Sequence, residues 1–165
     1  MTNNNRIFKE GAYQIDCSKA IYASNGMRDY YQQDVFAKYQ LSDVDWVIED
    51  DDYIYLVEYK NSNVNNAIDM KIEKKIDSLS KKFHHSLLFL FAIGTTKQVK
   101  CIAILDSQKD DARARQEVRN QLIQRLPMRM KRILPKEEKV IVDVIVYSIA
   151  DWNNNPDYGG KYPIS

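Results

Sequence analysis

The segment between residues 44 and 60 constrains the fold more than any other part of the chain. Residues 44–49 and 53–60 are rich in Val, Ile, Tyr and Trp, and three aspartates at 50–52 separate them. Aromatic and β-branched residues favour strands, and a short polar connection between two such runs favours an antiparallel hairpin. The sequence therefore predicts a β-hairpin with its turn at the three aspartates.

A turn centred between Asp51 and Asp52 also predicts the register of this hairpin. Side chains alternate between the two faces of a strand, so each face takes every second residue of both strands. One face pairs Asp45 with Glu58 and Asp43 with Lys60, and continues through Val47, Glu49, Ile54 and Leu56. The other face is apolar and consists of Val44, Trp46, Ile48, Tyr55, Val57 and Tyr59. We therefore expect both faces to be covered, as in a central hairpin.

The rest of the chain predicts helices that alternate with strands. An amphipathic helix is indicated by apolar residues at steps of three and four: Ile68, Ile72, Ile76, Leu79 and Phe83. The apolar run 87–93 fits either a buried strand or a continuation of this helix up to Gly94, and the continuation is preferred. Further helices are expected at 17–23, 28–39 and 110–133, strands at 99–105 and 139–148, and turns from residue 151 onward. This order predicts an α/β protein, with residues 1–165 forming one domain of helices on a central mixed β-sheet.

Composition and charge limit the setting in which such a chain works. With 165 residues, of which 44% are hydrophobic, the chain is long enough to bury a core. Residues 1–60 carry 6 Lys and Arg against 11 Asp and Glu, and the remaining residues carry 18 against 12. This asymmetry fits a metal site beside a phosphate-binding surface, and it equally fits two solvated faces. Without a signal-peptide pattern or a bilayer-spanning apolar run, a cytoplasmic protein is expected.

The pair of acids at Asp45 and Glu58 is the feature that points to chemistry. Two carboxylates on opposed strand positions repel each other unless a cation lies between them. Mg²⁺ or Mn²⁺ suits such oxygen ligands, and Lys60 reaches the same point from the same face. Two acids and a lysine suit phosphodiester hydrolysis, in which a metal activates water and positive charge stabilises the phosphate. The alternative is a structural salt-bridge face in which Lys60 pairs with Asp43 or Glu58.

The segment Asp45-Trp46-Val47-Ile48-Glu49, followed by the turn and Ile54-Tyr55-Leu56-Val57-Glu58-Tyr59-Lys60, resembles the core motif of the PD-(D/E)XK nuclease superfamily. The resemblance implies a restriction-endonuclease-like fold and a metal-dependent endonuclease that cleaves DNA in preference to RNA. It implies that Asp45, Glu58 and Lys60 are catalytic, with Mg²⁺ or Mn²⁺ as the cofactor.

The same resemblance implies the further metal ligands. The backbone carbonyl of Tyr59 stands where members of the superfamily often contribute a ligand, next to Asp45 and Glu58. Many members add an acid from the first helix, for which Glu10 is preferred here over Asp34. The chain has Val44 where the motif has its proline, which the family often dispenses with.

Cationic residues on the two predicted long helices are candidates for contact with the phosphate backbone of a nucleic acid. The nucleic-acid-binding candidates are Lys74, Lys75, Arg113, Arg115 and Arg119. The alternative is that these are ordinary solvated helix faces. Because the chain has no separate specificity domain, a homodimer or a protein partner is expected to supply targeting. The rival interpretation is an inactive nuclease-fold module that binds nucleic acid or protein, as an antitoxin or immunity protein does.

Overall fold

The computed structural model describes residues 6–27, 41–61, 70–106, 111–131 and 138–165. The helix expected at 28–39, together with Asp34, lies outside these residues. The elements are β1 (Ile7–Glu10), β2 (Tyr13–Asp16), β3 (Tyr22–Ser24), β4 (Trp46–Glu49), β5 (Tyr53–Asn61), α3 (Met70–Ala92), β6 (Gln98–Asp106), α4 (Ala112–Arg125), β7 (Ile141–Tyr147) and α5 (Ile149–Asn154).

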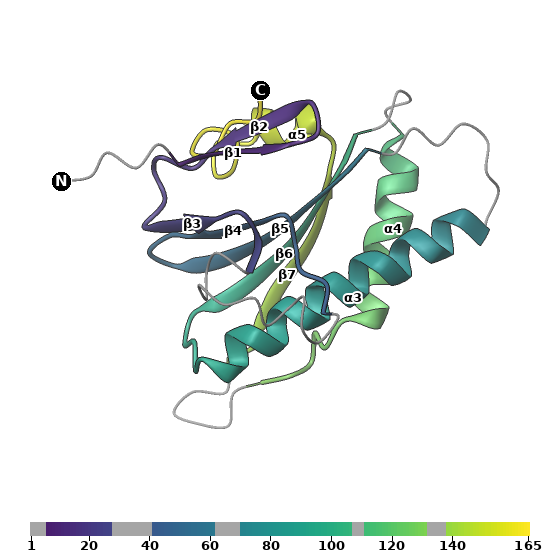
Figure 1. Ribbon diagram of the computed structural model, residues 1–165. Helices are drawn as coiled ribbons and strands as arrows, with labels where there is room; N and C mark the ends of the chain where they lie inside the picture. Colours follow the sequence, from purple (N-terminus) through teal and green to yellow (C-terminus); the bar gives the residue numbers. More distant parts are fainter. Residues whose placement is uncertain (1–5, 28–40, 62–69, 107–110, 132–137) are drawn as a thin grey trace.

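A mixed sheet with the strand order β3-β4-β5-β6-β7 forms the centre of the described structure (Figure 1). β3 pairs with β4 and β4 pairs with β5 in antiparallel orientation, whereas the pairs β5–β6 and β6–β7 are parallel. The parallel strands are linked through α3 and α4, as parallel pairs require a crossover. The expected α/β architecture, helices on a mixed sheet, is confirmed.

The predicted hairpin has the predicted register. Trp46 pairs with Val57, and Glu49 pairs with Ile54. β5 is the middle strand of the five and is hydrogen-bonded to β4 on one side and β6 on the other. Because β4 begins at Trp46, Asp43 and Asp45 precede the strand instead of lying within it. Val44 accordingly packs on the face opposite to the one expected for it.

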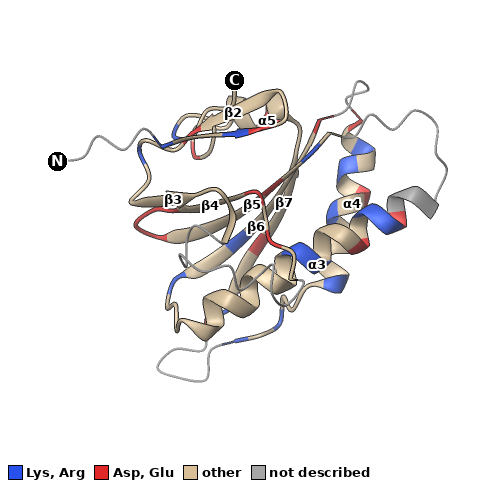
Figure 2. Ribbon diagram, in the orientation of Figure 1, with Lys and Arg blue, Asp and Glu red and all other residues tan. Residues whose placement is uncertain are grey.

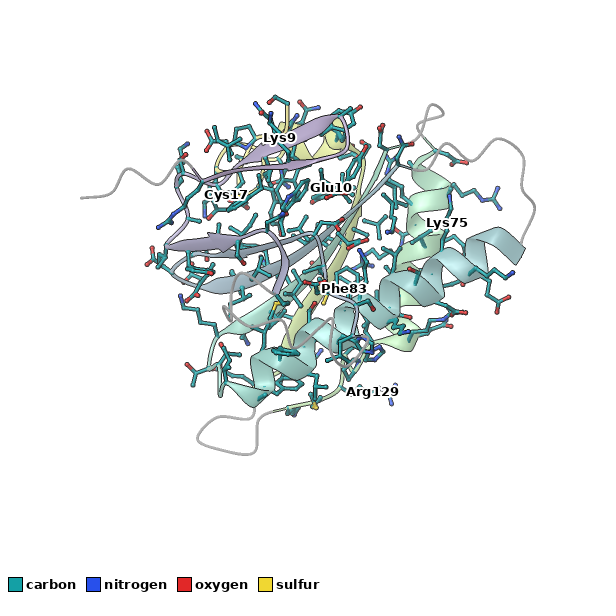
Figure 3. All side chains as sticks on the ribbon, in the orientation of Figure 1. Lys9, Glu10, Cys17, Lys75, Phe83 and Arg129 are labelled. Atoms are coloured by element: carbon teal, nitrogen blue, oxygen red, sulfur yellow. The ribbon has the colours of Figure 1, made fainter. Side chains whose placement is uncertain are left out.

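Two apolar clusters cover the two faces of the sheet. Figure 1 shows α3 and α4 on one side, and the β1–β2 hairpin with α5 on the other. The helix-side cluster includes Ile76, Leu79 and Phe83 of the predicted stripe, all of which are buried. Figure 3 shows Phe83 on the side of α3 toward the sheet. The opposite cluster contains Trp46 of β4 and Trp152 of α5.

α3 continues through most of the apolar run as expected and ends at Ala92, two residues before Gly94. This glycine has a φ of +70°, a conformation that side chains with a Cβ rarely adopt. The Gly94 amide donates to the Phe91 carbonyl at 3.0 Å, and the Thr95 amide donates to the Leu90 carbonyl at 3.1 Å. This pair of hydrogen bonds is the Schellman motif, which satisfies carbonyls that the helix end would leave unpaired.

Three sequence-based expectations were wrong. Residues 17–23 do not form a helix, because the Asp16 carboxylate accepts a hydrogen bond from the Ser18 amide (2.9 Å) and β3 then pairs with β4. α4 ends at Arg125 instead of continuing to 133, because Pro127 has no amide hydrogen and holds Leu126 extended. Part of the expected C-terminal turn region forms α5, which begins with a capping box between Ser148 and Asp151. No helix within the described ranges has the length and apolarity needed to cross a bilayer.

The turn of the central hairpin is held by the carboxylate of Asp50, which is itself buried. One oxygen accepts hydrogen bonds from the amides of Asp52 (3.0 Å) and Tyr53 (2.9 Å), and the other accepts one from the Tyr55 hydroxyl (2.6 Å). Burial alone would raise the pKa of Asp50, but these hydrogen bonds and the nearby Lys161 lower it below its usual value. The folded state therefore stabilises the ionised carboxylate.

Asp50→Ala is expected to lower the free energy of unfolding by about 3 kcal/mol, because it leaves a buried hydroxyl and two amides without their acceptor. The pKa of Asp50 is lower in the folded chain than in the unfolded chain, so the contribution is complete above about pH 4. It is lost as the pH falls through the lowered folded value. Urea unfolding at pH 7 and pH 3 measures this, with the exposed neighbour Asp51→Ala as control. If both substitutions lowered the free energy of unfolding equally, the Asp50 carboxylate would not be what stabilises the turn.

Candidate metal centre

Four charged side chains meet beside the central strand. Glu58 and Lys60 alternate along β5 and therefore share one face, the face that packs against α3. Asp45 lies directly before β4, next to the last paired residues of the hairpin. Lys82 reaches the same point from the middle of α3. The structure thus brings together the three predicted residues and adds a fourth.

Glu58 is the centre of this group and has no solvent exposure (0%). Its Oε1 lies 2.7 Å from Nζ of Lys60 and 2.7 Å from Nζ of Lys82, and its Oε2 accepts a hydrogen bond from Lys82 at 2.9 Å. Both ammonium groups therefore contact the same buried oxygen of Glu58. Burial, followed by the nearby Asp45, raises the pKa of Glu58 to about 7, although both ammonium groups act to lower it.

Asp45 is oriented by the backbone of the opposite strand. Its Oδ2 accepts a hydrogen bond from the Tyr59 amide at 2.8 Å, and its Oδ1 lies 3.3 Å from Nζ of Lys82. The hydrogen bond fixes the carboxylate so that its other oxygen is directed toward the same cation that Glu58 contacts. Tyr59, whose carbonyl is a predicted metal ligand, is therefore also the residue whose amide positions Asp45.

Lys82 is the functional candidate that sequence reasoning missed, because it is not a member of the apolar stripe that indicated the helix. It lies three residues after Leu79 and four before Ser86, both of which are buried. This helical spacing places Lys82 on an inward row of α3 and was the available signal. Burial acts to lower the pKa of Lys82, but the carboxylates of Glu58 and Asp45 outweigh it and raise the pKa, so the side chain is cationic.

A polar cavity of about 580 Å³ opens beside this group. Its walls include Glu10, Asp43, Asp45 and Lys82. Glu10, the predicted additional acid, is at the end of β1 instead of on a helix, and Figure 3 shows it on the side of its hairpin that faces the sheet. Burial, followed by the nearby Asp45, raises the pKa of Glu10.

Asp43 has a structural partner in this cavity wall. Its Oδ2 accepts a hydrogen bond from the Met27 amide at 2.9 Å, which ties the segment before β4 to the residues after β3. Lys60 pairs with Glu58, which is one of the two partners expected for it in a structural salt-bridge face. The ion pair by itself is compatible with both a salt-bridge face and a catalytic lysine.

The oxygen atoms present fit a hard divalent cation such as Mg²⁺ or Mn²⁺. Asp45 presents one carboxylate oxygen, and Glu58 presents a buried oxygen that only ammonium groups contact among the described ion pairs. Within the described ranges, no three His, Cys, Asp or Glu side chains are close enough to hold a metal by themselves. Mg²⁺ is commonly bound through one or two carboxylates, with water and phosphate oxygens completing its coordination. Such an ion would take the position that the Lys82 ammonium has in this structure.

The predicted nucleic-acid-binding residues differ in their surroundings. Figure 2 shows Lys and Arg on both α3 and α4, with acidic residues between them. Lys74 and Arg113 are exposed, and Lys75 is partly exposed. Arg115 pairs with Asp151 at 2.8 Å, whereas Arg119 donates to the Val144 carbonyl at 2.7 Å and pairs with Asp143 at 3.2 Å. The last two arginines thus connect α4 to β7 and α5.

Comparisons with known proteins identify no relative of this chain: no family model, no curated protein and no solved structure matches it.

Proposed function

We propose that this chain is a metal-dependent nuclease of restriction-endonuclease-like fold that hydrolyses phosphodiester bonds in DNA. The observation that supports this most is the fully buried Glu58, which is held on the central strand with Asp45 and Lys60 around it. A carboxylate without solvent, with its pKa raised and a polar cavity beside it, is costly to the fold and typical of a functional site. The motif resemblance supplies the chemistry.

In the proposed reaction, Asp45 and Glu58 hold the metal and Lys60 acts on the substrate. A bound Mg²⁺ would lower the pKa of a water molecule and neutralise charge on the phosphate. Lys60 is the more exposed of the two lysines (32% against 20% for Lys82), so its ammonium can contact a phosphate oxygen at the surface of the site. Its fixed positive charge would then stabilise the charge that develops on the phosphate during hydrolysis. The Tyr59 amide keeps Asp45 in place.

The surface that would hold the DNA backbone is proposed to include the exposed cations of α3 and α4. Lys74 and Arg113 are exposed and Lys75 is partly exposed, so these three candidates lie at the surface where phosphates could be contacted. Arg115 and Arg119 would first have to leave Asp151 and Asp143. Targeting through a homodimer or a protein partner remains part of the proposal, because the described elements all belong to the sheet and its covering layers.

Cleavage assays on plasmid, linear duplex, single-stranded DNA and RNA, each with Mg²⁺, Mn²⁺ or EDTA, test the proposal directly. We expect metal-dependent cleavage of DNA by the wild type. Lys60→Ala should lower the rate on the order of 100-fold, the usual effect of removing one group that stabilises transition-state charge. Lys9→Ala, at an exposed position on β1 outside the proposed DNA-binding surface, serves as the control for loss of a lysine charge. No cleavage of any substrate, with no rise in melting temperature on adding metal, would overturn the nuclease proposal.

The second candidate function is a non-catalytic module of the same fold that binds nucleic acid or a protein. The observation that favours it is the Lys82 ammonium, which already compensates both acids without a metal. A stable complex with DNA or with one protein, combined with no response to Mg²⁺ or Mn²⁺, would select this function over the nuclease.

A further inference from the structure

Lys82 stands where a metal bound by Asp45 and Glu58 would stand. Its Nζ lies 2.7 Å from Oε1 and 2.9 Å from Oε2 of Glu58, and 3.3 Å from Oδ1 of Asp45. A divalent ion bound to the same oxygens would be about 2 Å from them and would leave no room for the ammonium. The lysine and the metal are therefore alternatives at one position.

The charges of the group lead to the same conclusion. Two carboxylates, Asp45 and Glu58, face two ammonium groups, those of Lys60 and Lys82, so the group is formally neutral without a metal. A divalent ion would add two positive charges to a site whose central carboxylate is fully buried. Because like charges at this range repel strongly in a poorly solvated site, binding of the ion favours departure of one ammonium. Lys82 contacts both acids, so it is the group that the ion would replace.

The structure also provides a place for the displaced side chain. Lys82 lines the polar cavity, and its side chain is 20% exposed, so its ammonium can turn into that space. Glu10 lines the same cavity and already acts electrostatically on Lys82 and Asp45. A lysine has four rotatable bonds, so its ammonium can change partners without movement of α3.

We infer that Lys82 is an internal counter-ion that keeps Asp45 and Glu58 paired in the metal-free protein and must be displaced before a divalent cation binds. This inference rests on the proposed metal site. It gives Lys82 a role distinct from that of Lys60: Lys82 sets the affinity of the site for divalent cations. The apparent affinity of a ligand falls by the fraction of molecules that are competent to bind it, so a resident ammonium weakens metal binding.

Direct Mn²⁺ binding to the full chain tests this inference, followed by the electron paramagnetic resonance signal of free Mn²⁺. Lys82→Met removes the charge and keeps most of the side-chain length, and we expect it to bind Mn²⁺ at least about tenfold more tightly than the wild type. The matched control is Lys81→Met, whose side chain is exposed and which should bind Mn²⁺ like the wild type. Asp45→Asn should lose binding, which identifies the site being measured.

The melting temperature in EDTA provides a second measurement. Removing one partner of a buried ion pair leaves the other uncompensated, so Lys82→Met should melt about 5–10 °C below the wild type without metal, and Mn²⁺ should reverse this loss. If the variant is poorly folded, Lys82→Gln, which can still donate a hydrogen bond to the acids, replaces it in both measurements.

The outcomes separate this inference from the proposed function. Mn²⁺ binding by the wild type that is not tightened in Lys82→Met or Lys82→Gln would overturn the counter-ion role and leave the nuclease proposal standing. Absence of Mn²⁺ binding in the wild type and in both variants would overturn both. Binding by the variants but not by the wild type would support the counter-ion role in its strongest form, in which Lys82 keeps the metal out.

Discussion

Asp45→Asn is expected to lower Mg²⁺-dependent DNA cleavage by at least about 1000-fold. The substitution keeps the shape of the side chain and an oxygen that can accept the Tyr59 amide hydrogen bond, but removes the negative charge that holds the metal. Metal ions contribute several kcal/mol to stabilising the transition state of such reactions, and about 1.4 kcal/mol corresponds to a factor of ten in rate. Initial cleavage rates at saturating metal measure the effect.

The control for this prediction is Asp52→Asn, the same chemical change at an exposed acid in the hairpin turn. It should leave the cleavage rate and the metal response unchanged. In the wild type, metal at about 100 times its dissociation constant should raise the melting temperature by roughly 5–10 °C, and this rise should vanish in Asp45→Asn. If Asp45→Asn cleaves DNA and responds to metal like the wild type, Asp45 is not a ligand and the proposed centre is wrong.

Trp152→Ala is expected to have the largest effect on stability, lowering the free energy of unfolding by about 4 kcal/mol. Trp152 of α5 is fully buried, its ring stacks on Tyr158 at a centroid distance of 5.3 Å, and its Nε1 donates to the Tyr162 carbonyl at 2.7 Å. The substitution therefore leaves a cavity between the sheet and the C-terminal segment, and removes the hydrogen bond that holds Tyr162 there. Urea unfolding followed by circular dichroism measures the change.

Two further substitutions separate packing from hydrogen bonding at this position. Trp152→Phe keeps an aromatic ring but loses the donor to Tyr162, so it should cost less than Trp152→Ala. Leu88→Ala truncates an exposed side chain on α3 and should change the stability by less than about 0.5 kcal/mol. If Trp152→Ala changed the free energy of unfolding as little as Leu88→Ala does, the C-terminal segment would not contribute to the core.

Local sequence patterns predicted the elements that depend on short-range interactions. The hairpin register followed from its turn and from the alternation of apolar residues, and β4 and β5 have that register. The apolar stripe of α3 was visible because helical periodicity repeats over many residues, and Gly94 ends the helix as expected. At residues 17–23 the local pattern predicted a helix, but the pairing of β3 with β4 decided the secondary structure there.

The sequence by itself determined that Glu58 and Lys60 share one face, because a strand places alternate residues on one face whatever surrounds it, and the hairpin register brought Asp45 next to them. Only the tertiary structure decided how these groups are compensated. The Tyr59 amide orients Asp45 across the hairpin, whereas the burial of Glu58 and the Lys82 ammonium between the two acids depend on how α3 packs on the sheet. The physical reason is that burial and ion pairing are set by distances between segments remote in the chain, and no local pattern of residue types encodes those distances.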